Sequence, residues 1–181
     1  MSKTVMLSIR PKWCEKIASG KKTVEVRKTK PKLKPPFKCY IYCTKDKNNH
    51  FWSGKRYSYA DDHSHNAFDK IGSGKIIGEF ICDQIYELAP LNHAPDDVEQ
   101  QACLTREEIV RYLKGVGYGW HISDLKIYDK PKELTEFHTW KKCKSCSKSG
   151  YESTACIYDK NCMVPVAITK APQSWCYVEE G

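Results

Sequence analysis

The chain has 181 residues, of which 40% are hydrophobic, and it carries a formal net charge of +8. This length and composition suit a single domain over residues 1–181 with one buried core. No run of 18 apolar residues is present, which excludes a membrane-spanning helix, and the opening MSKTVMLSIR lacks the apolar segment of a signal peptide. We therefore expect a cytoplasmic protein, in which the ten cysteines are core thiols or metal ligands rather than disulfides.

The positive charge is concentrated near the N-terminus. Residues 1–38 contain twelve Lys and Arg and two acidic residues, a net charge of +10, whereas the remaining residues sum to −2. Such a concentration favours an anionic partner, most simply nucleic acid. A solvated basic face would have the same composition, so charge alone leaves both interpretations open.

The first elements in chain order are a strand, a helix and a second strand. Residues 5–9 form a short apolar run typical of a buried strand. Pro11 suits the first turn of a helix over 11–19, and Gly20 can end this helix in a left-handed conformation. A second strand is predicted over 22–28, directly after this glycine.

The second strand carries polar side chains on one face. Thr23, Glu25 and Arg27 alternate with Val24 and Val26, and residues two apart in a strand share a face. The valines are therefore expected in the core. The polar face, with the two lysines before it, is either a surface ion pair or the floor of a binding site.

The rest of the chain is rich in strand signals and has few helices. Residues 45–73 are polar and are predicted to be an insertion, and 75–88 is predicted to be one long strand with a bulge at Gly78. Thr105 and Glu108 form a capping box at the start of a helix that reaches about residue 114. Further strands are expected at 37–44, 124–129, 164–168 and 173–178. This pattern predicts an α+β fold built on a small barrel.

These segments, in this order, resemble the ASCH domain family, whose members are relatives of the PUA domain. The family hallmark Gly-x-Lys-x-x-Glu-x-Arg is met by Gly20, Lys22, Glu25 and Arg27. The resemblance covers most of residues 5–44, 74–137 and 164–178. It implies a mixed, partly closed PUA-like β-barrel with flanking helices, a cleft beside the hallmark, and an association with RNA.

The favoured function is binding of single-stranded RNA or a nucleotide in a basic cleft around GKKTVEVR. Lys22 and Arg27 would contact phosphate or base, and Glu25 would orient Arg27 or accept from a base amine. Trp120 would stack on a base, because glycines around it leave room for a ligand, although core packing is the alternative for this side chain. The residues expected to bind nucleic acid are Lys21, Lys22, Glu25, Arg27, Trp120 and His121.

The alternative function is a hydrolase in the same cleft, acting on a modified nucleoside or cleaving RNA. Lys22 and Glu25 would then be the catalytic pair. One branch of the family deacetylates acetylcytidine nucleosides with a Lys, a Thr and a Glu, and Lys22 matches that Lys. Glu25 replaces the Thr, and Ala102 stands at the position of the acid, with Glu99 the nearest carboxylate. The resemblance to this branch is therefore incomplete.

A cysteine-rich segment at 138–163 predicts a small zinc knob. It holds Cys143, Cys146, Cys156 and Cys162, and a Cys-x2-Cys pair places two thiolates within reach of one tetrahedral ion. A polar segment without an apolar core of its own gains its folding energy from such a site. The prediction is one structural zinc ion, with four surface thiols as the alternative.

Overall fold

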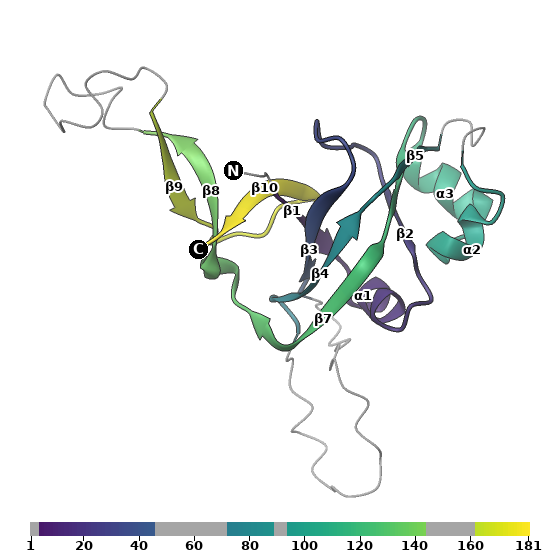
Figure 1. Cartoon of the computed structure of the whole chain (residues 1–181). Coiled ribbons are helices and arrows are strands. Elements are labelled where there is room, and N and C mark those ends of the chain that lie inside the picture. The colour runs from purple at the N-terminus through teal and green to yellow at the C-terminus, as the bar shows by residue number, and fades with distance from the viewer. Residues whose placement is uncertain (1–3, 46–71, 89–93, 144–161) are drawn as a thin grey trace, which may run out of the picture.

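The computed structural model describes residues 4–45, 72–88, 94–143 and 162–181 (Figure 1). Its elements are β1 (Thr4–Ile9), α1 (Pro11–Ala18), β2 (Val24–Arg27), β3 (Phe37–Cys43), β4 (Ile76–Cys82), β5 (Ile85–Glu87), α2 (Val98–Ala102), α3 (Arg106–Leu113), β6 (Tyr118–His121), β7 (Ser123–Lys132), a 3-10 helix (Leu134–Glu136), β8 (Phe137–Lys142), β9 (Met163–Ala167) and β10 (Trp175–Glu180). The predicted α+β class is confirmed. Across the described ranges, no helix has the length and apolar character needed to cross a membrane.

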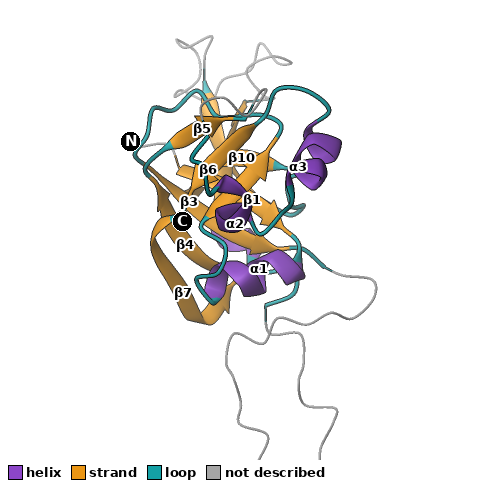
Figure 2. Ribbon diagram, turned by 90° about the vertical axis from the view of Figure 1, so that its right-hand side faces the viewer, coloured by secondary structure: helices purple, strands orange, loops and turns teal. Residues whose placement is uncertain are grey.

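The strands form two sheets. The larger has the order β7-β4-β3-β1-β10-β8-β9 and the smaller β2-β6-β5, and only β1 and β3 pair in parallel among the described strands. No pairing of described strands joins the edges at β7 and β9, so the large sheet is open rather than closed into a barrel. The three helices gather on one side of the sheets (Figure 2), and the β8–β9 hairpin extends away from them (Figure 1).

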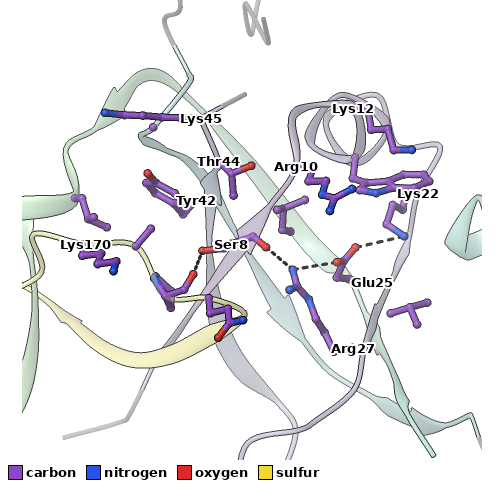
Figure 3. A pocket seen from close by; sticks show the side chains of 18 of the residues that line it. Ser8, Arg10, Lys12, Lys22, Glu25, Arg27, Tyr42, Thr44, Lys45 and Lys170 are labelled. Carbon is purple, nitrogen blue, oxygen red and sulfur yellow. Dashed lines mark hydrogen bonds and ion pairs between the residues drawn. The ribbon is translucent and has the colours of Figure 1, made fainter. Parts of the chain in front are cut away.

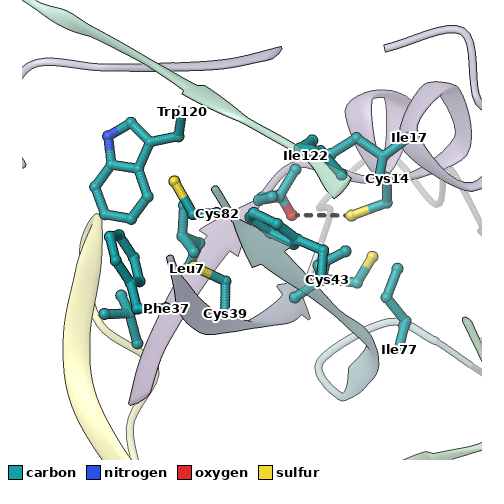
Figure 4. Close-up of a cluster of buried hydrophobic side chains, with 14 residues drawn as sticks. Leu7, Cys14, Ile17, Phe37, Cys39, Cys43, Ile77, Cys82, Trp120 and Ile122 are labelled. Atoms are coloured by element: carbon teal, nitrogen blue, oxygen red, sulfur yellow. Dashed lines mark hydrogen bonds between the residues drawn. The ribbon is translucent and has the colours of Figure 1, made fainter. Parts of the chain in front are cut away.

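β1 is mostly apolar because both of its faces are buried. Val5, Leu7 and Ile9 pack into the main core, in which Figure 4 shows Leu7 beside Cys39. Met6 points the other way, into a second cluster that contains Tyr40. This double burial explains why β1 lacks the alternation of polar and apolar residues that a half-exposed strand shows.

β2 has one apolar and one charged face, as its sequence predicts. Val24 and Val26 are buried against α2 and α3, where they contact a third cluster that includes Ile109. Gly119 on the neighbouring β6 allows this close packing, because a Cβ there would lie 2.9 Å from Val24 Cγ1. The glycine beside Trp120 therefore makes room for a core valine, not for a ligand.

Several predicted boundaries are confirmed and one is wrong. Gly20 has a φ of +72° after α1. The capping box is present, with Glu108 N donating to Thr105 Oγ1 at 3.2 Å and Thr105 N donating to Glu108 Oε2 at 2.8 Å. The register of β4 against β7 shifts between Ile76 and Gly78, which confirms the bulge. The single strand predicted at 75–88 is instead β4 and β5, which belong to different sheets.

The ends of the predicted cysteine knob are the two strands of a hairpin. Lys142 pairs with Met163 in the β8–β9 ladder. Cys143 N donates to Cys162 O at 3.0 Å directly beyond this pair. Cys146, Cys156 and most of the predicted 45–73 insertion lie outside the described residues. Within the described ranges no group of three or more potential metal ligands occurs, and the four-cysteine site stays a prediction.

Candidate functional site

A cleft of about 920 Å³ opens beside the junction of β1 and α1 (Figure 3). Its wall is formed by this junction, by β2, by the end of β3 and by the segment that precedes β10. The charged lining residues are Arg10, Lys12, Lys22, Arg27, Lys45 and Lys170, with Glu25 and Glu133 as the acidic ones. Six cationic and two anionic side chains make the cleft a region of positive potential, which attracts anions.

Three of these charges form a buried network that we call the triad: Lys22, Glu25 and Arg27. Their exposed fractions are 2%, 7% and 6%. Lys22 Nζ lies 3.3 Å from Glu25 Oε2, and Arg27 Nη2 lies 3.1 Å from Glu25 Oε1. One carboxylate thus bridges two cations, which is how charges are tolerated away from water.

Lys22 uses its hydrogen-bonding capacity inside the protein. Its ammonium group donates to the carbonyl oxygens of Val24 and Ala102, both at 2.8 Å, in addition to its ion pair with Glu25. An ammonium group has three N–H donors, and here three acceptors surround it. Lys22 therefore fixes the end of α2 against β2 and has no donor left for a ligand.

Arg27 joins β2 to two other parts of the cleft wall. Nη2 donates to Ser8 O at 2.7 Å, and Nη1 donates to the carbonyl oxygen and hydroxyl of Ser174, both at 3.4 Å. Its Nε is buried and has no hydrogen-bond partner among the described residues. The triad thus holds together the floor of the cleft, with its cations directed along that floor (Figure 3).

The groups that can meet a ligand lie on the rim and the far wall. Arg10, Lys12, Lys45 and Lys170 are exposed, and none belongs to an ion pair within the described ranges. The hydroxyl of Tyr42 faces the cleft (Figure 3), and burial raises the pKa of this phenol, so it stays a neutral donor. Free cations beside a fixed neutral donor suit an anionic ligand with polar groups.

Trp13 is one of the aromatic residues that line the cleft, with Tyr42 and Tyr112. This partly buried side chain on α1 lines the cleft. The ammonium groups of Lys12, Lys16 and Lys22 lie 4.4, 5.2 and 5.1 Å from its ring centroid. Trp13 falls at helical spacing with Cys14 and Ile17, a pattern typical of an apolar, core-facing position, so the sequence did not single it out as a site residue. The signal was its position directly after the cations Arg10 and Lys12, a few residues before the hallmark.

Trp120, expected to stack on a base, is in the core. It is fully buried and lies beside Phe37 (Figure 4), with 5.8 Å between the two ring centroids. Its ring centroid is 6.0 Å from that of Trp175. The expectation of base stacking is therefore wrong for this residue. Trp120 is paired with Glu25 in the β2–β6 ladder, so its backbone lies next to the triad. Its side chain, however, is buried in the core and does not reach the cleft surface.

Two further expected residues lie outside the cleft lining. His121 Nδ1 is 2.6 Å from Asp83 Oδ1. Burial would raise the pKa of Asp83, but the hydrogen bond and charge of His121 outweigh this and hold that pKa below its ordinary value. Lys21 is exposed, and its carbonyl oxygen accepts from Cys103 Sγ at 3.2 Å. Of the six residues expected to bind nucleic acid, the structure brings three together, namely the triad.

The structure also describes Ala102, the residue at the position of the acid in the deacetylase branch. Ala102 lies beside Lys22, but it offers only its carbonyl oxygen, at 2.8 Å. Glu99 is paired with Arg106, at 3.7 Å between Oε2 and Nε, and is not part of the cleft lining. The carboxylate next to Lys22 is that of Glu25, which two cations already share.

Comparison with known families identifies the fold. Residues 7–170 match the profile of the ASCH domain. The chain belongs to the ASCH domain family. A search of curated proteins found no match. The solved structures that resemble this ASCH domain include the crystal structures of ASCH from Zymomonas mobilis and of two single-residue variants of it. Each has 19% sequence identity and a TM-score of 0.50, over 73% of this chain and 74–76% of theirs. This likeness concerns the fold.

Proposed function

We propose that this ASCH domain binds single-stranded RNA or a nucleotide in the cleft around the triad. The observation that carries the proposal is a cleft with six cationic and two anionic lining residues, built on a buried ion network. Its volume of about 920 Å³ lies within the range of small-ligand sites, roughly 300–1,000 Å³. The relation of ASCH domains to RNA-associated PUA domains supports the same ligand class.

The positions of the lining residues suggest a different ligand contact for each group of them. Exposed Arg10 and Lys12 would contact phosphate, since unpaired cations at a rim form charge-assisted hydrogen bonds with it. Trp13 would stack on a base in place of Trp120, and Tyr42 would donate from the far wall. The triad would shape the floor and add positive potential, because its hydrogen bonds are largely made within the protein.

The hydrolase alternative has less support from the described residues. A catalytic Lys22 needs a lone pair or a free N–H directed at the substrate, whereas its ammonium group faces three protein acceptors. A catalytic Glu25 needs a free carboxylate oxygen, whereas both oxygens are ion-paired. No described residue supplies the missing acid beside Ala102.

We also propose that Cys143, Cys146, Cys156 and Cys162 bind one structural zinc ion. The proposal rests on their spacing in the sequence. The hairpin adds support for two of them, because it brings the backbone of Cys143 and Cys162 together at 3.0 Å.

The cleft is tested with two double variants of equal charge. Arg10→Gln/Lys12→Gln removes rim cations, and Lys126→Gln/Lys130→Gln removes two exposed charges on β7, outside the cleft lining. Binding of fluorescein-labelled 12-nucleotide oligouridine and oligoadenosine is measured by fluorescence anisotropy. We expect the rim variant to lose about tenfold or more in affinity, equivalent to roughly 1.4 kcal/mol, and the β7 variant to stay near wild type. Equal losses in both variants would contradict binding in the cleft.

A further inference from the structure

We infer that the loop at residues 28–36 extends the cleft into a surface that follows the phosphates of a single-stranded polynucleotide. This inference rests on the proposed function, and it selects a polymer over a free nucleotide as the ligand. We call Lys28, Lys30, Lys32 and Lys34 the lysine tract.

The tract is a run of alternate, unpaired cations. All four lysines are exposed, and the segment KTKPKLKPP contains no acidic residue. In the described part of the chain, no carboxylate lies within ion-pair distance of any of these ammonium groups. Their charge is therefore available to an external anion.

The loop that carries the tract is attached to the body of the protein. Thr29 Oγ1 accepts from Trp175 Nε1 at 2.9 Å, and Lys32 N donates to the Tyr177 hydroxyl at 2.9 Å. Pro31 is buried, and Leu33 packs against the main core. A backbone held at four points presents its lysines in a defined arrangement, so less conformational entropy is lost on binding.

The tract begins at the edge of the cleft. Lys28 Nζ lies 5.4 Å from the ring centroid of Tyr112, which is 44% exposed and also lines the cleft. Lys30 Nζ lies 4.7 Å from the ring centroid of Tyr118. Two of the four cations thus lie beside aromatic rings, and the first of these rings lines the nucleotide-sized cleft. Basic side chains together with aromatic rings are the combination that single-strand binding surfaces use. A phosphate-rich membrane would use the lysines alone, which is why we favour a polynucleotide.

The test compares a quadruple variant with a charge-matched control. Lys28, Lys30, Lys32 and Lys34 are changed together to Gln, and the control changes Lys126, Lys130, Lys141 and Lys142 to Gln, all exposed on β7 and β8. The probes are a 12-nucleotide oligouridine, the four ribonucleoside 5′-monophosphates, and vesicles containing phosphatidylserine. Oligouridine affinity is measured from low to high salt.

We expect the tract variant to bind oligouridine at least tenfold more weakly, with unchanged affinity for the monophosphates. Its salt dependence should become shallower by up to about 2.8 in log–log slope, because each phosphate of a single strand that a lysine neutralises adds about 0.7 to that slope. The control should keep the wild-type slope. An unchanged oligouridine affinity, an equal effect in the control, or a loss confined to vesicles would overturn the inference. Failure of the wild type to bind either class of ligand, the oligomer as well as the monophosphates, would instead overturn the proposed function.

Discussion

Glu25 is the residue on which the site depends most. It is buried, and its two carboxylate oxygens each pair with a different cation. Alternation along the strand predicted that Glu25 and Arg27 would share a face, and the family hallmark added Lys22, which precedes β2. It did not predict that their hydrogen bonds would be satisfied by the backbone of Ser8 and Ala102, since these contacts depend on how distant segments pack.

Replacing Glu25 should destabilise the whole protein. Glu25→Gln leaves two buried cations without their shared anion, and breaking such a pair costs about 3–5 kcal/mol in the free energy of unfolding. Glu133→Gln is the matched control, since its ion pair with Lys75 is well exposed and contributes about 0–1 kcal/mol. Urea denaturation measures both. A loss for Glu25→Gln as small as that of the control would show that the triad is not a structural network.

The two tryptophans should separate stability from binding. Trp120→Ala should lower the free energy of unfolding by about 3–5 kcal/mol, because it empties a fully buried site. Trp13→Ala should weaken oligouridine binding by about 1–3 kcal/mol, the value of one stacked base. Trp120→Phe is the control that keeps the core filled and should leave binding unchanged. Weaker RNA binding by a stably folded Trp120→Phe variant would show that Trp120 contributes to the binding site after all.

The elements show why local sequence predicts some features and not others. The capping box at Thr105 was predictable because it depends on residues three apart. The division of 75–88 into β4 and β5 was not, because each half pairs with a different sheet. Trp120 was misassigned because its neighbour Gly119 serves packing within the small sheet, where a Cβ would crowd Val24 on the paired strand β2.

One ion pair between β3 and β4 should govern part of the acid stability. Glu79 lies 2.8 Å from Lys38 and accepts from the Tyr128 hydroxyl. Burial would raise the pKa of Glu79, but these two partners outweigh it and lower that pKa below the ordinary value of 4.5. The stabilisation is therefore complete above about pH 4.5 and is lost as the pH falls through the lower, folded-state pKa.

The corresponding experiment is urea denaturation of wild type and Glu79→Gln between pH 7 and pH 2. The variant should be less stable at neutral pH, and the difference should shrink as the pH falls below about 4.5. A difference that is constant across this range would mean that the charge of Glu79 is irrelevant to stability.

The β8–β9 hairpin should depend on zinc at its far end. Elemental analysis should find about one zinc ion per chain, as a four-thiolate site requires. Chelation, or Cys143→Ser, should increase amide hydrogen exchange in β8 near Lys142, while β1 and β3 remain protected because they lie in the body of the large sheet. Cys176→Ser is the control, since this cysteine lies on β10. A metal-free protein with undiminished protection in β8 would exclude the zinc site.

At the scale of the whole molecule, part of the N-terminal excess of positive charge is concentrated along one wall of the cleft. Arg10, Lys12, Lys22 and Arg27 all come from the first 38 residues, so composition predicted this part of the wall. The opposite wall includes Lys170, which is far away in the sequence and reaches the cleft only because β10 pairs with β1. Local sequence patterns could therefore predict the residues of the cleft floor, but not those of the opposite wall.

The most direct test of the central claim is an NMR titration of the ¹⁵N-labelled protein with ribonucleoside 5′-monophosphates. The proposed function predicts chemical-shift changes at the amides of Ser8, Thr44 and Thr169, three cleft-lining residues from separate parts of the chain. Trp120 and its core neighbours should change little. Shifts that instead centre on His121 and Asp83, or the absence of any shift at saturating nucleotide, would contradict a nucleotide site in this cleft.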